Sequence, residues 1–205
     1  MNVVATRFVT CQTGCVDHAF PCGNTALDFV GTLRARRNLV PLEKLGSPES
    51  LDSWFRESGV VDGDTNSRPA DVTKAVALRE AIYSLVAARL HHESYDEDAL
   101  SLVNRAARVA PAIPQLTLSG RWVEATPEQA LSSVARVAID ILSGPERELL
   151  KECGRPECTQ VYLDHSRGFR REWCAMETCG NKMKAAAYRA RKRGNPPRPV
   201  TPRRG

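Results

Sequence analysis

The sequence lacks the features that define several large classes of protein. No stretch approaches the roughly 20 consecutive apolar residues that a membrane-spanning helix needs. Its first residues, Met1 to Ala19, have neither the basic start nor the continuous apolar core of a signal peptide. There is no phosphate-binding glycine loop, no nucleophile motif, no pair of carboxylates in an apolar setting and no internal repeat. We therefore expect a cytoplasmic protein that makes no membrane contact and is not an enzyme.

Acidic residues are missing from the C-terminal end of the chain. Residues 182–205 hold nine lysines or arginines and no aspartate or glutamate, whereas the rest of the chain has 20 basic and 24 acidic residues. This division predicts an acidic body and an end that binds a polyanion. Charge alone would equally fit a solvated tail, and residues 195–205, rich in proline and arginine, are predicted to be disordered.

Four cysteines just before this basic end form two short-spaced pairs. They follow the pattern C-x4-C, fifteen residues, C-x4-C, and are Cys153, Cys158, Cys174 and Cys179. In a protein without export signals, such pairs favour a metal cage over disulfides. Four thiolates suit the tetrahedral preference of zinc, so one structural Zn²⁺ is predicted.

The other three cysteines, Cys11, Cys15 and Cys22, have His18 among them, which raises the question of a second metal site. Their spacing is irregular, and no basic or glycine-rich frame surrounds them. We expect ordinary thiols at these positions.

The first 145 residues carry the periodicity of a mainly helical domain. Capping residues and apolar stripes predict five helices. They run from Asn24 to near Arg37, from Ser47 to near Gly59, from Ala70 to near His92, from Asp96 to near Pro111, and from Thr126 to near Gly144. A single small β-hairpin is expected around Ser119-Gly120. Residues 1–145 are therefore interpreted as a helical regulatory domain, linked by a short helical segment to the cysteine module.

Residues 146–194 are expected to form a zinc finger of the treble-clef or zinc-ribbon type. A tight Cys153–Cys158 turn precedes an alternating segment, Gln160 to Asp164, that predicts a strand. A basic helix from about Gly180 to Arg193 then follows the last cysteine, with Met183, Ala186, Ala187 and Ala190 expected to face inward.

At these residues the chain resembles the CGNR zinc-finger proteins of bacteria. The resemblance rests on Trp173-Cys-Ala-Met-Glu-Thr-Cys-Gly-Asn-Lys182 and on the Lys-Ala-Ala-Ala-Tyr-Arg-Ala-Arg run that ends at Arg191. Lys182 stands where the family name has arginine, which keeps the charge and loses the bidentate fork. The segment from Phe20 to Leu33 resembles the N-terminal domain that accompanies this finger, described as a stress-induced transcription regulator. The resemblance implies a DNA-binding regulator of a stress response.

Our main hypothesis is a transcriptional regulator that binds duplex DNA through the finger and its basic helix, close to the nucleoid. Phosphate contacts would come from arginines of the finger loop and the helix, and base contacts from the start of the helix. The predicted nucleic-acid contacts are Arg167, Arg170, Arg171, Asn181, Lys182, Lys184, Arg189, Arg191, Lys192 and Arg193.

Two alternatives remain open from the sequence. One is an RNA-binding zinc ribbon, in which Tyr162, Trp173 and Tyr188 would offer stacking faces. The other is a protein-interaction adaptor whose zinc only stabilises an interface. The sequence also leaves open the target sequence, the inducing signal, a homodimer and a small-molecule effector of the N-terminal domain.

Overall fold

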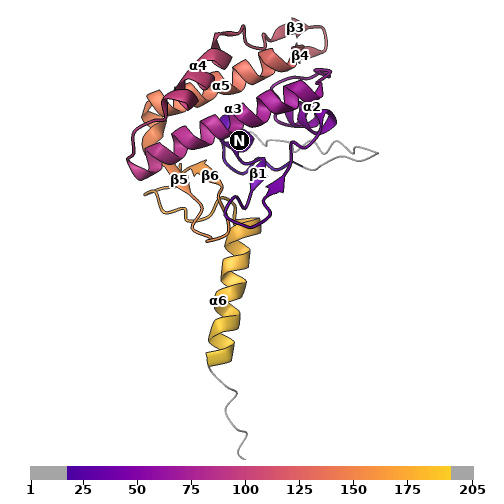
Figure 1. Cartoon of the computed structure of the whole chain (residues 1–205). Coiled ribbons are helices and arrows are strands. Elements are labelled where there is room, and N and C mark those ends of the chain that lie inside the picture. The colour runs from indigo at the N-terminus through magenta and orange to yellow at the C-terminus, as the bar shows by residue number, and fades with distance from the viewer. Residues whose placement is uncertain (1–17, 195–205) are drawn as a thin grey trace, which may run out of the picture.

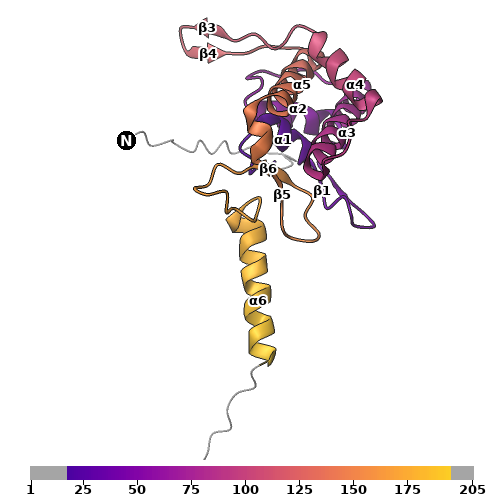
Figure 2. The same ribbon diagram turned by 90° about the vertical axis from the view of Figure 1, so that its left-hand side faces the viewer.

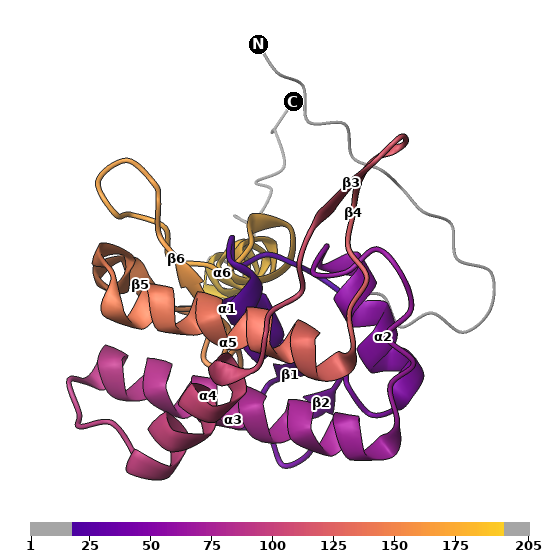
Figure 3. The same cartoon turned by 90° about the horizontal axis from the view of Figure 1, so that it is seen from above.

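The computed structural model describes residues 18–194. The predictions made for Cys11, Cys15 and residues 195–205 concern parts of the chain outside this range. Within it, the body consists mainly of helices, as predicted: α1 Thr25–Val30, α2 Pro48–Glu57, α3 Pro69–His91, α4 Glu97–Arg108 and α5 Pro127–Ser143. Helix α3 runs alongside α5, and α4 packs on both of them (Figures 1 and 3). None of the helices described is long and apolar enough to cross a membrane.

The helix starts follow the capping chemistry that the sequence predicts. The Ser47 and Thr126 side chains each accept a hydrogen bond from the backbone N–H three residues on, and a proline occupies the first turn of both helices. Asp96 caps α4 in the same way. Gly59, predicted to stop α2, has a φ of +74°, the left-handed conformation that favours glycine after a helix.

The first helix is shorter than predicted. It ends at Val30 instead of near Arg37, because the Thr32 hydroxyl bonds back to the Phe29 carbonyl and the chain turns into strand β1, Leu33–Arg34. Strand β1 pairs with β2, Leu42–Glu43. The buried Arg79 side chain on α3 holds this hairpin through a bidentate pair with Glu43, at 2.6 and 2.8 Å.

The hairpin predicted at Ser119-Gly120 is present, as β3 Gln115–Thr117 paired with β4 Gly120–Trp122. Two further two-stranded sheets are present in the described chain: β1–β2, a hairpin of the body that the sequence did not predict, and β5–β6, which belongs to the finger. These two lie at the end of the body that meets the finger (Figure 1). Their strands are only two or three residues long, too short to show a period in the sequence.

The core of the body is aromatic at its centre. Trp54 of α2 is fully buried and packs against Phe29 of α1 and Phe55, with ring centroids 4.9 and 5.8 Å away. Leucines, valines and alanines of α3 and α5 continue the same cluster as far as the finger. One continuous core therefore joins body and finger.

The C-terminal part begins with the short 3₁₀ helix η1, Pro145–Leu149, followed by β5 Leu150–Glu152, β6 Val161–Leu163, the π-type turn η2 Met176–Gly180 and helix α6 Asn181–Gly194. In Figures 1 and 2, α6 runs straight away from the rest of the protein. The expected inward face is wrong: Ala186, Ala187 and Ala190 are exposed and Met183 is only half-buried. Their spacing matches a buried stripe, but the described chain has no second element beside α6.

Candidate metal centre and nucleic-acid interface

The first cysteine pair lies in a tight turn between the two strands of the finger. Strand β5 ends immediately before Cys153, whose N–H bonds to the Gln160 carbonyl at 2.9 Å. The Cys158 N–H bonds to the Arg155 carbonyl at 2.8 Å, which closes the turn. These backbone bonds point both thiols to the same side of the hairpin, as the short spacing predicts.

The second pair comes from the loop after β6 and from η2. Cys174 is buried, and its N–H lies 3.5 Å from the Cys153 sulfur. Cys179 stands in η2, where Gly180 follows it. A Cβ atom at Gly180 would lie 2.6 Å from the Met176 sulfur, so the Met176 side chain packs closely on this glycine.

The four sulfurs form a compact cluster that fits one metal ion. All four lie within 4.8 Å of one another, and three of the cysteines are buried. A tetrahedral site with Zn–S bonds of about 2.3 Å has S···S edges of roughly 3.8 Å. The Cys158–Cys174 and Cys174–Cys179 sulfurs are 3.8 and 3.6 Å apart, close to that edge. The cluster therefore fits one structural zinc ion, which would tie β5, the loop and η2 together.

Hydrogen bonds link the thiols of the cluster. Hydrogen bonds from Cys158 and Cys174 lower the pKa of Cys153, so a thiolate is favoured there. Donating its proton to Cys153 raises the pKa of Cys158 to about 12. Arg155 adds a positive charge, with its guanidinium 3.9 Å from the Cys179 sulfur. A bound zinc would displace the remaining protons and stabilise all four thiolates.

Arg171 fastens the finger to the body. Its guanidinium donates to the Trp173 carbonyl at 2.9 Å, to the Cys174 carbonyl, and to the Pro21 carbonyl of the body at 2.9 Å. It also lies over the ring of Tyr162, 4.3 Å from the centroid. Arg171, a predicted nucleic-acid contact, is thus engaged inside the protein.

Further contacts between backbones and side chains complete this joint. The Leu163 N–H of β6 bonds to the Cys22 carbonyl at 3.3 Å, so the body supplies a partner for a finger strand. The Gln160 side chain is 5% exposed and packs on Gly31, where an added Cβ would lie 2.4 Å from its amide oxygen. Arg37 and Glu152 form an ion pair of 2.5 Å across the same boundary. The body therefore fixes the orientation of the finger.

The basic side chains of α6 project into solvent along its length. No acidic residue occurs in the helix, and none of its lysines and arginines pairs with a carboxylate of residues 18–194. The exposed basic residues are Lys182, Lys184, Arg189, Arg191, Lys192 and Arg193. Asn181 is exposed at the first position of the helix, and its side chain makes no hydrogen bond with the described chain.

Arg167 and Arg170 lie on the loop before Cys174, also exposed and without an ion pair in the described chain. On the body side of α6, a cleft of about 550 Å³ separates the β1–β2 hairpin from the finger. Arg34, Asn38, Arg155 and Lys182 line this cleft together with two glutamates, Glu157 and Glu177.

The body residues of this cleft were not predicted as site residues. Arg34 and Asn38 are over 140 positions from α6 in the chain, and only the fold of the β1–β2 hairpin brings them to its base. The nearby Arg36 has another role: it pairs with Glu80 and covers the Tyr83 ring at 4.1 Å. The only signal in the sequence was the basic run from Arg34 to Arg37. Such a run does not show which of its arginines faces solvent.

A helical body that carries a four-cysteine finger defines a zinc-binding protein. Residues 23–145 match the family model ABATE, described as "Putative stress-induced transcription regulator". Residues 150–192 match the model of the CGNR zinc finger. Because the first match covers more than half of the chain, the chain belongs to the ABATE family. No curated protein matches the sequence.

Proposed function

We propose that this protein is a transcriptional regulator that binds duplex DNA, with the zinc finger holding α6 in the major groove. The observation that carries the proposal is α6 itself, a helix of 14 residues that projects from the body with six exposed basic side chains and no acid. A helix without packed neighbours is marginal in water. A polyanion that neutralises its charges would stabilise it.

Two further surfaces support DNA as the partner. Arg167 and Arg170 lie before the cage, and Arg34 lies in the cleft on the body side of the α6 root. Exposed cations on the finger and the helix, together with the half-buried Arg34 of the body, suit a phosphate backbone, which carries charge at regular spacing on both strands. Asn181, exposed and unbonded, is the side chain we assign to a base edge.

The RNA alternative has less support. Of its three stacking faces, Tyr162 is fully buried and donates its hydroxyl to the Arg171 carbonyl, and Trp173 is half-buried. Tyr188 alone is freely exposed, at 60%. Single-stranded RNA is recognised mainly by stacking of splayed bases, which needs several such faces.

We assign no catalysis to the finger, because a zinc ion held by four thiolates has no open position for water. The proposal also keeps the predicted division of the chain: residues 1–145 as the regulatory domain, 146–194 as the finger, and 195–205 as a tail outside the described residues.

The test is a salt titration of binding to duplex DNA, with the full-length zinc-loaded chain. Neutralising four basic residues of α6 together should reduce the slope of log affinity against log salt by up to about 3.6, at roughly 0.9 per phosphate contact. These are Arg189, Arg191, Lys192 and Arg193. The matched control neutralises four exposed arginines of the body, Arg68, Arg108, Arg121 and Arg136, and changes the net charge equally.

The control should leave the slope nearly unchanged, since these arginines lie away from the finger. Equal loss in both variants would show that only net charge matters and would contradict the assigned surface. A wild-type chain that prefers single-stranded RNA in competition would favour the ribbon alternative. Binding to neither nucleic acid would favour the adaptor.

Base contact by Asn181 needs a separate measurement. Because its side chain makes no capping bond in the described chain, Asn181→Ala should leave the melting temperature unchanged. It should reduce discrimination at one base position by about 1–3 kcal/mol, the range for a good bidentate pair. An even loss over all sequences would contradict the assignment.

A further inference from the structure

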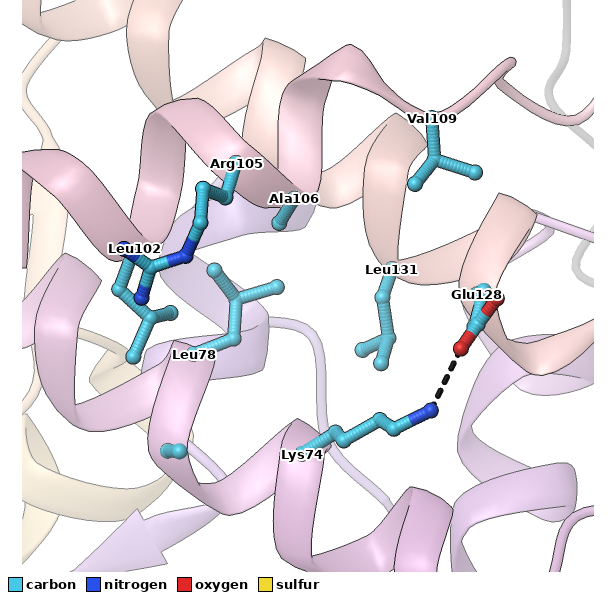
Figure 4. A pocket seen from close by; sticks show the side chains of 9 residues that line it. Lys74, Leu78, Leu102, Arg105, Ala106, Val109, Glu128 and Leu131 are labelled. Carbon is cyan, nitrogen blue, oxygen red and sulfur yellow. Dashed lines mark hydrogen bonds and ion pairs between the residues drawn. The ribbon is translucent and has the colours of Figure 1, made fainter.

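The body has a cavity that takes no part in the proposed DNA surface. It lies between α3, α4 and α5, at the end where α4 stops, and has a volume of about 430 Å³. That volume falls within the range of small-molecule sites. Figure 4 shows Leu78 of α3 and Leu131 of α5 pointing into the space between the helices. Both leucines are almost completely buried, so the cavity has a closed apolar floor.

Charged groups stand on opposite sides of this floor. On one side, Lys74 of α3 and Glu128 of α5 form an ion pair of 2.5 Å that bridges the two helices (Figure 4). On the other side, Arg105 of α4 bonds only to the Ser101 hydroxyl on its own helix, at 2.7 Å. Arg105 has no carboxylate partner among residues 18–194. One cation is therefore neutralised and the other is free.

We propose that this cavity binds a small amphipathic carboxylate, with its alkyl chain or ring on the leucine floor and its carboxylate on Arg105. The planar guanidinium matches a carboxylate through two parallel hydrogen bonds. A phosphate ester, with a charge of about −1.5 to −2 at neutral pH, carries more charge than one free arginine balances. The apolar residues Leu102, Ala106 and Val109 complete the wall.

The size of the cavity argues against a protein occupant. Nine residues line it, whereas a stable protein interface uses about 20–30 residues on each side. An apolar pocket with a few convergent polar groups is the common form of a small-molecule site. The ligand class goes beyond the proposed DNA binding and does not depend on it.

Calorimetric titration of the full-length zinc-loaded chain tests this inference in the absence of DNA. The probes are octanoate and 4-phenylbutyrate, each compared with the neutral alcohol of the same skeleton. We expect one acid molecule per chain, bound at least about tenfold more tightly than its alcohol, as a charge-assisted hydrogen bond implies. Failure of both acids to bind at millimolar concentration overturns the proposal, as does equal affinity for acid and alcohol.

Variants locate the site. Arg105→Gln should lower the affinity for the acids to that of the alcohols and leave alcohol binding unchanged. Arg108→Gln is the matched control, because Arg108 is exposed one turn further along α4 and does not line the cavity. Loss of acid binding in both variants, or in neither, overturns the assignment to Arg105.

Filling the cavity gives an independent check. Ala106→Phe should abolish binding of acids and alcohols alike. The variant should keep the helical circular dichroism of the wild type. If that variant fails to fold, Ala77→Leu serves instead, since Ala77 is exposed on α3 and lines the cavity. Wild-type binding by a folded cavity-filled variant would place the ligand elsewhere and contradict the proposal.

Discussion

The carboxyl group of Asp28 gives a quantitative test of the joint between body and finger. Asp28 belongs to α1, is 5% exposed, and accepts a hydrogen bond from the Cys22 N–H at 2.9 Å. Cys22 in turn offers its carbonyl to strand β6 of the finger. Burial raises the pKa of Asp28 from 3.8 to about 6, although the bond from Cys22 opposes this change. The fold therefore prefers the neutral acid.

The sign and size of the effect on stability follow from this pKa. The folded protein holds the proton of Asp28 more tightly than the unfolded chain does. The stabilisation that this proton gives the fold is therefore fully present below about pH 4. This contribution is lost as the pH rises through about 6. A shift of about 2 pKa units corresponds to about 3 kcal/mol at neutral pH.

Asp28→Asn keeps an oxygen acceptor for the Cys22 N–H and removes the ionisation. Its free energy of unfolding, measured in urea with zinc present, should rise relative to wild type between pH 5 and pH 7.5. We expect the difference to grow by about 1–2 kcal/mol, since wild-type Asp28 is mostly protonated at the lower pH. Asp140→Asn, exposed on α5, is the control and should show a constant difference. A difference for Asp28→Asn that is constant or shrinks with pH would refute the reasoning.

Two further predictions concern the finger. Cys174→Ser should abolish stoichiometric zinc by elemental analysis and unfold the finger, because structural zinc contributes roughly 10–16 kcal/mol of apparent binding energy in small modules. Cys22→Ser should retain one zinc, and loss of zinc in both variants would contradict the assigned ligands. Arg171→Lys should cost about 2–3 kcal/mol in urea unfolding, since it loses the fork that reaches three carbonyls. Unchanged stability with weaker DNA binding would instead make Arg171 a DNA contact.

The sequence predicted those parts of the fold that depend on local chemistry. Ser47, Asp96 and Thr126 cap helices because a side-chain oxygen three residues before a free N–H is sufficient, whatever the rest of the chain does. The cysteine cluster was predictable for the same reason, because the spacing within each pair sets the geometry of its turn.

The parts that failed depend on contacts between distant segments. The stripe of Met183, Ala186, Ala187 and Ala190 has the period of a buried face, but periodicity does not say whether a neighbour exists. Arg171 stays a predicted phosphate contact, but its hydrogen bond to the Pro21 carbonyl, 150 positions away, could not be predicted from its charge. Arg34 was missed because the hairpin that carries it is too short to predict.

The direction of α6 depends on the joint between the body and the finger. Among the described elements, the helix has its main contact with η2 of the finger. The finger therefore sets the direction of α6, and the body sets the orientation of the finger. Fourteen residues extend about 21 Å, and a rotation of about 10° at the base would move the far end by roughly 4 Å. That displacement exceeds the 3.4 Å rise of one base along a DNA strand. Helices α3 and α5, which line the proposed ligand cavity, also contact β5 and η1 respectively. In the proposed complex, a ligand that shifts either helix would move the elements on which the finger rests. A small movement there would be sufficient to change which bases α6 meets.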